Sequence, residues 1–189
     1  MLPRHTPWGD IHDQREHAPG IVNVSTAGHG GFWLSAERLA EFRAVFPDFD
    51  PYAGEPWFEE DEDWAVVVLA FPDMFDDEST WTAVEAVPVA RRISQSLYSD
   101  GANRWIPVES WLANTMVGRA AVDRAKRFKA TVATMWQHGS MGSTDTPGKW
   151  WVLFTRVGDK AQRAVTMPSY PMKRFWTGAE LDQFTAVAA

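Results

Sequence analysis

The sequence predicts an α+β fold, a single domain in which a small, mostly antiparallel sheet packs with two to four helices. Short apolar stretches bounded by turn residues are typical of strands joined by hairpins. Other stretches repeat apolar residues at helical spacing behind a capping residue. A length of 189 residues suits one domain. We therefore expect an N-terminal arm over residues 1–20 and one α+β domain over 21–189.

The N-terminal part predicts an arm followed by a hairpin. Residues 1–20 combine proline, glycine and charged side chains, so we expect little regular structure there. Residues 21–26 alternate apolar and polar side chains, as a half-buried strand does. Residues 27–31, three of which are glycines, predict a turn, and residues 32–34 predict the return strand.

The next segment predicts a helix, a loop and a buried element. Ser35 is a good N-cap for a short amphipathic helix that ends at Pro47. Residues 48–63 are acidic and contain prolines and a glycine, which predicts a surface loop. Residues 64–71 form a continuous apolar run that suits a central strand, although periodicity alone does not distinguish it from a buried helix.

The middle of the chain predicts two helices. Residues 80–97 read as a helix interrupted at Pro88, and residues 98–103 form a turn cluster. Pro107 suits a first helical position, so we expect a long helix from there to about residue 129.

The C-terminal part predicts strands and a short last helix. Residues 131–136 favour a strand, and residues 137–148 predict a flexible loop because they are rich in glycine and small polar residues. Residues 150–156 and 163–167 predict a hairpin. Thr177 begins a capping-box pattern for a short helix.

Charge is distributed unevenly along a chain whose net charge is −7. Residues 41–80 hold thirteen acids and one base, whereas residues 81–189 hold eight acids and fourteen bases. Such a chain either folds its charges against each other or presents them to a charged partner, and a homodimer is one such partner. The eleven tryptophans suit an aromatic core, a contact surface or both.

Composition excludes several classes of protein. The chain has no cysteine, which excludes disulfides, thiol catalysis and thiolate metal sites. We see no secretion signal and no apolar run long enough to cross a bilayer, so we expect a cytoplasmic protein without membrane contact. His5, His12 and His17 match no common zinc spacing, and we expect neither metal nor cofactor.

The acidic run 59–63 is the strongest charge signal. Its five carboxylates suit a divalent cation, a phosphate mimic or a dock for a basic partner, and the alternative is a solvated loop. We predict a partner-binding surface comprising this run and neighbouring aromatic and acidic residues: Trp57, Phe58, Glu59, Glu60, Asp61, Glu62, Asp63, Asp76 and Asp77.

The glycine-rich loop is the sharpest local motif, and its members are Gly28, His29, Gly30 and Gly31. The glycines let a ligand approach the backbone closely, and His29 is a candidate general acid or base. The alternative is a hairpin turn with His29 merely exposed.

A cluster of basic residues suits either binding of single-stranded nucleic acid or a cationic helix end. Its members are Arg119, Arg124, Lys126, Arg127 and Lys129.

Several blocks resemble an uncharacterised family of domains of unknown function found in proteobacterial, plasmid and phage proteins. They are Thr6-Pro7-Trp8-Gly9, residues 18–21, residues 24–31, residues 34–38 and residues 59–66. The resemblance implies no activity. Small acidic proteins of mobile elements often resemble anti-restriction or anti-CRISPR proteins, which occlude a nucleic-acid-binding surface.

Two functional hypotheses follow. The first is a mobile-element protein that inhibits a host defence or nucleic-acid-handling complex, a protein or nucleoprotein with a basic surface, through the acidic, tryptophan-rich surface. The alternative is an enzyme, a transferase or hydrolase, in which His29 works with a carboxylate of the run 59–63. That enzyme requires the two segments to meet in a concave pocket.

Overall fold

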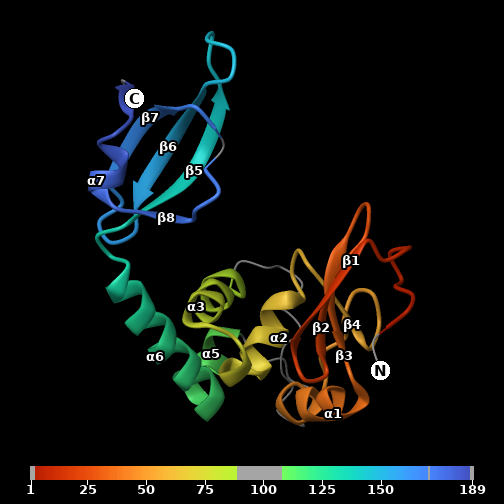
Figure 1. The fold of residues 1–189 in the computed structure, drawn as a ribbon. Helices are drawn as coiled ribbons and strands as arrows, with labels where there is room; N and C mark the ends of the chain where they lie inside the picture. Colours follow the sequence, from red (N-terminus) through yellow and green to blue (C-terminus); the bar gives the residue numbers. More distant parts are fainter. Residues whose placement is uncertain (1–2, 89–107, 170, 188–189) are drawn as a thin grey trace. The chain divides into compact units, whose positions relative to one another are not determined.

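A computed structural model describes residues 3–88, 108–169 and 171–187 of the chain (Figure 1). Contacts divide the chain into two compact units, Met1–Lys126 and Arg127–Ala189. The first unit holds a four-stranded antiparallel sheet and the second a five-stranded one. The α+β fold class predicted from the sequence is confirmed. Whether the two units behave as one domain over residues 21–189 stays a prediction.

The sheet of the first unit has the order β1-β2-β3-β4. Its strands are β1 (Asp13–Ala18), β2 (Ile21–Ser25), β3 (Gly30–Leu34) and β4 (Trp57–Glu59). The predicted hairpin is confirmed as β2 and β3. The expectation of little regular structure before residue 21 is wrong for β1, which pairs with β2. Because the side chains of β1 are almost all exposed, no apolar alternation announces it.

Helices pack against one face of this sheet and enclose the core. Among the described residues, the helices wholly within the first unit are α1 (Ala36–Val45), α2 (Trp64–Ala70), the 3-10 turn η1 (Pro72–Met74), α3 (Asp77–Ala86) and α5 (Val108–Asn114). Figure 1 shows α2 beside the sheet and α1 at one end of it. Ser35 accepts a hydrogen bond from the Arg38 N–H at 3.3 Å, which confirms the predicted N-cap. Phe42 is buried, and its ring centroid lies 4.7 Å from that of Phe58.

The apolar run 64–71 is a helix, α2, and not the central strand that its valines favour. Residues 65–69 are buried. A helix surrounded by other elements needs apolar residues on every side, so it has no amphipathic period that would distinguish it from a buried strand. The alternative left open by the sequence is therefore the one observed.

Two helices replace the single one expected after Pro107. The second of them, α6 (Met116–Thr131), follows α5 with a break at Thr115. The Thr115 hydroxyl donates to the Trp111 carbonyl and accepts from the Gly118 N–H, both at 2.9 Å, so it caps α6. The expectations for residues 89–97, the turn at 98–103 and Pro107 itself lie outside the described residues.

The sheet of the second unit has the order β8-β5-β6-β7-β9. Its strands are β5 (Trp136–Ser143), β6 (Trp150–Arg156), β7 (Gln162–Met167), β8 (Phe175–Trp176) and β9 (Thr185–Val187). The predicted hairpin of β6 and β7 is confirmed. The expected strand at 131–136 is wrong up to residue 135, because α6 continues to Thr131 and residues 132–135 form turns before β5 begins at Trp136. The expected loop at 137–148 is wrong up to residue 143, because β6 gives this glycine-rich stretch a partner strand.

One face of this second sheet is packed beneath α7 (Gly178–Leu181). The buried side chains there are Val152, Phe154, Val165, Met167 and Leu181. Thr177 and Glu180 form the predicted capping box, in which the Thr177 hydroxyl accepts from the Glu180 N–H at 3.2 Å. Glu180 also binds Lys173 Nζ at 2.5 Å.

Glu180 is expected to titrate well below its ordinary range. Hydrogen bonds from Lys173 and then from Thr177 lower the pKa of Glu180 to about 2. Because the pKa in the folded state is lowered, the ionised carboxylate stabilises the fold above the ordinary pKa, and that contribution is lost as the pH falls toward 2. We expect Lys173→Met to raise the pKa in an NMR titration and Lys149→Met to leave it unchanged. An equal shift in both variants would contradict the local cause.

Candidate functional site

The glycine-rich loop and the acidic run lie side by side because β3 pairs with β4. Gly31 is the partner of Glu59 in the register, and the Glu60 N–H donates to the Gly30 carbonyl at 3.1 Å. The structure thus brings together the two segments that the sequence singled out. We call the chain from Glu59 to Asp63 the acidic turn.

Two of the loop glycines are required by this close approach. Gly31 has a φ of 153°, and a Cβ there would collide with the Phe58 carbonyl oxygen and lie 2.7 Å from a ring atom of Trp8. A Cβ on Gly30 would lie 2.5 Å from a carboxylate oxygen of Glu60. Gly28 has open space around it. Because they have no side chain, Gly30 and Gly31 leave room for the neighbouring chain around β4 and for the Trp8 ring.

The acidic turn exposes only part of its charge. Glu59 and Asp63 are buried, with 8% and 0% of their surface exposed. The Glu59 carboxylate accepts from the N–H groups of Asp61 and Glu62 at 2.9 and 3.1 Å, and Asp63 accepts from the Tyr52 N–H at 2.8 Å. These two carboxylates shape the turn from inside, which corrects their placement on a partner-binding surface.

Glu60 and Asp61 are the exposed members of the turn, and Glu62 is half-buried. Phe58, also predicted for the partner-binding surface, is fully buried in the core, where it stacks with Phe49 and packs edge-on against Phe42. Strand alternation explains this, since Phe58 faces the helices and its neighbours on β4 face the other way.

Three half-buried tryptophans occupy the face of the sheet that points away from the core. Trp33 and Trp57 are directly paired across β3 and β4, so their side chains share this face. Trp8 packs edge-on against Trp57 with ring centroids 5.7 Å apart. In Figure 1 the segment before β1 runs along the side of the sheet remote from α2. We call Trp8, Trp33 and Trp57 the tryptophan face.

Asp76 and Asp77 have structural roles that the sequence did not predict. Asp76 accepts from the Ser79 N–H at 2.7 Å and caps α3. Its partial burial raises the pKa of Asp76, but hydrogen bonds from Ser79 outweigh this effect and lower the pKa below its usual value. Asp77 pairs with Arg124. Both carboxylates are therefore already engaged within the first unit.

His29 is exposed at the tip of the hairpin. Its carbonyl oxygen accepts from the Thr26 N–H and from the Thr26 hydroxyl, both at 2.8 Å. Its N–H donates to the same hydroxyl at 3.1 Å. The backbone of His29 thus closes the turn. His29 immediately precedes Gly30, the glycine against which the Glu60 carboxylate lies.

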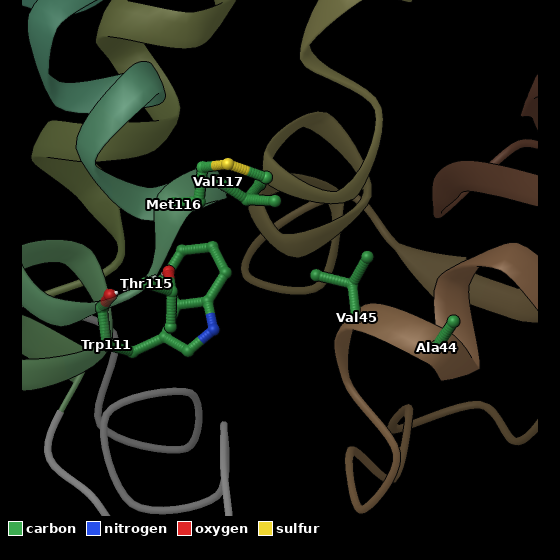
Figure 2. Close-up of a pocket in the computed structure, with 6 residues that line it drawn as sticks. All are labelled: Ala44, Val45, Trp111, Thr115, Met116 and Val117. Atoms are coloured by element: carbon green, nitrogen blue, oxygen red, sulfur yellow. Dashed lines mark hydrogen bonds between the residues drawn. The ribbon is translucent and has the colours of Figure 1, made fainter.

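Two cavities among the described residues of the first unit are lined by neither His29 nor the acidic turn. One, of about 240 Å³, lies between the end of α1 and the corner of α5 and α6. Figure 2 shows the Trp111 ring facing Val45 across it, with Met116 above. The other, of about 430 Å³, lies along α5 and α6 and is lined by Leu112, Ala113, Arg119, Val122, Asp123 and Lys126.

Two of the basic residues singled out on α6 donate hydrogen bonds to nearby backbone carbonyls. Arg119 donates to the Asn114 carbonyl at 3.0 Å, and Arg124 donates to the carbonyls of Pro72 and Phe75. Lys126 and Arg127 are exposed, and Lys129 is half-buried.

Within the described ranges, no cluster of three or more histidine, aspartate or glutamate side chains has the geometry of a metal site. No helix in those ranges is long and apolar enough to traverse a bilayer.

A family model described as a domain of unknown function, DUF7007, matches residues 1–138. The chain belongs to this family. The match supports the resemblance to uncharacterised domains. Searches of the curated proteins and of the solved structures find no match to the chain. The DUF7007 region spans the acidic turn, the tryptophan face and the beginning of the second sheet.

The sequence of this DUF7007 member does not indicate that Trp8, Trp33 and Arg124 belong to the site or to the scaffold that supports it. Trp8 stands in a sequence block that carried the resemblance, but nothing in the sequence shows that it packs over Gly31. The sequence places Trp33 only in a return strand, and its pairing with Trp57 depends on β4. In the sequence Arg124 is one of several cations, whereas in the structure it links α6 to η1 and α3.

Proposed function

We propose that the protein is a mobile-element inhibitor that binds a host defence or nucleic-acid-handling complex through Glu60, Asp61 and the tryptophan face. The observation that carries this proposal is the combination of two exposed carboxylates directly after β4 and three half-buried tryptophans on one face of the same sheet. Tryptophan is the residue most enriched among those that dominate binding energy, and exposed carboxylates accelerate encounter with a basic surface.

The internal hydrogen bonds of the acidic turn support this assignment. Because Glu59 and Asp63 hold the turn from inside, Glu60 and Asp61 are presented without ordering a flexible loop on binding. Pre-organisation of this kind reduces the entropic cost of association. Trp57 is positioned by its place in β4, two residues before the buried Glu59.

Charge reversal at the two exposed carboxylates tests the proposal. The double variant Glu60→Lys/Asp61→Lys is expected to lower affinity for the partner about tenfold or more, because like charges face each other across the interface. The assay is capture of the partner from the native host by tagged protein, followed by titration of the purified partner. Urea unfolding should show that both proteins are folded.

The matched control is Asp48→Lys/Asp73→Lys, which changes the net charge equally at two exposed positions away from the acidic turn. It is expected to retain the partner. Equal loss in both variants would show a general charge effect and overturn the proposed surface. Capture of a complex without a basic surface would overturn the proposed class of partner.

The enzyme hypothesis remains the alternative. It is favoured by the position of Glu60, whose carboxylate lies against Gly30, the residue after His29. Its weakness is that both cavities described above lie elsewhere. An empty capture experiment with folded protein would favour the enzyme and direct metabolite screening to His29.

A further inference from the structure

The five-stranded sheet of the second unit has one packed face and one open face. Along β6, Val152 and Phe154 point into the core beneath α7. Alternation therefore places Trp151, Leu153 and Thr155 on the opposite face. Their cross-strand partners on β5 and β7 share that face. We define the open face as Gln137, Trp151, Leu153, Thr155 and Thr166; Ala164 lies on the same side of the sheet but is buried.

Trp151 is the main apolar feature of the open face. Its indole lies against Gly142, its partner on β5, and a Cβ on that glycine would collide with the ring nitrogen and lie 2.8 Å from a ring carbon. The side chain is nevertheless 36% exposed. An aromatic ring supported by a strand and partly open to solvent is a stacking platform for a planar ligand.

The second unit has a net positive charge. The second unit holds eight basic and four acidic residues. Three of those acids, Asp159, Glu180 and Asp182, are paired with Arg156, Lys173 and Arg163. The five open-face residues carry no charge, and Lys149 immediately precedes β6.

The end of α6 and the start of β8 add further cations at the border of this face. Phe128 of α6 packs against Phe175 of β8 with ring centroids 6.0 Å apart. Phe175 pairs with Gln137 and so lies on the open-face side of the sheet. The Arg174 guanidinium lies 5.5 Å from the centre of the Phe175 ring, and Arg127 precedes Phe128 on α6.

We propose that the open face binds single-stranded nucleic acid, with a base stacked on Trp151 and phosphates near Lys149, Arg127 and Arg174. The charge complementarity is local, because the second unit is basic although the whole chain is acidic. The neutral polar groups of Gln137, Thr155 and Thr166 can hydrogen-bond to bases or sugars. A single strand leaves its base faces free for stacking, whereas a duplex does not. This site is separate from the surface assigned under the proposed function.

Fluorescence anisotropy of the full-length protein with labelled oligodeoxythymidine and oligouridine, about 16 nucleotides long, tests the site at about 50 mM salt. Trp151→Ala is expected to weaken binding about tenfold or more, and Trp151→Phe to restore most of it. The matched control is Trp150→Ala. Trp150 is 37% exposed and adjacent in sequence, but it points to the opposite face of the sheet, so its removal should leave affinity unchanged.

Two further variants keep the test decisive if Trp151→Ala fails to fold. Gly142→Ala displaces the indole without removing it and is expected to weaken binding. Lys149→Glu is expected to weaken binding and to reduce its salt dependence. The proposal is overturned if wild-type protein binds neither oligonucleotide, if Trp150→Ala weakens binding as much as Trp151→Ala, or if a duplex binds more tightly than both single strands.

Discussion

Replacing Gly31 with alanine is expected to lower the free energy of unfolding by about 3 kcal/mol or more and to detach β4 from β3. The φ of 153° is one that side-chain-bearing residues rarely adopt, and the new methyl group would collide with the Phe58 carbonyl. That carbonyl belongs to the strand backbone, so relief requires β4 to move. Urea unfolding followed by tryptophan fluorescence measures the loss.

The control for this change lies in the same motif. Gly28→Ala places its methyl group in open space and is expected to change stability by no more than about 0.5 kcal/mol. Similar losses at both positions would contradict the steric explanation. Because β4 leads into the acidic turn, Gly31→Ala should also weaken partner binding, and this loss would follow from a displaced turn.

Replacing Arg124 with methionine is expected to cost about 2 to 3 kcal/mol of stability. The guanidinium donates to the carbonyls of Pro72 and Phe75 and pairs with Asp77, so its removal leaves two partly buried carbonyls without this donor. Methionine retains much of the apolar stem. Thermal and urea unfolding should both show the loss.

Asp77→Asn separates the two contributions of Arg124. Asp77 is half-exposed, with 53% of its side-chain surface accessible, so its ion pair contributes little. We expect Asp77→Asn to change stability by less than about 1 kcal/mol. If Asp77→Asn were as damaging as Arg124→Met, the ion pair and not the carbonyl contacts would be the main contribution.

Local signals predicted a good part of this fold. Ser35, Thr177 and the hairpin turns were read correctly because capping and turn chemistry depend on residues three or four positions apart. The β6 and β7 strands were also predicted, since both have strong apolar and β-branched stretches. The fold class followed from these elements.

The errors have a common physical cause, which is dependence on distant partners. The buried helix α2 has no period because other elements surround it. The glycine-rich strand β5 is stabilised by pairing with β6, and its sequence alone resembles a loop. β1 is polar except for Ala18 and is held in the sheet by its pairing with β2.

The candidate site was predicted in composition but not in detail. The sequence indicated the acidic run and the glycine loop, and the structure brings them together. The sequence did not show which carboxylates point inward. Glu59 and Asp63 are distinguished from Glu60 and Asp61 by the backbone N–H groups that donate hydrogen bonds to them in the folded chain. Trp8 entered the site through packing between segments remote in sequence.

The packing of Trp8 also limits how far the N-terminus can be trimmed. Val22 and Val24 are almost completely buried, although they point away from the main core, and Val24 pairs with the glycine over which Trp8 lies. A truncation that begins at β1 would remove Trp8 and uncover apolar surface on this side of the sheet. Affinity tags therefore belong ahead of residue 3 and not in place of the residues before β1.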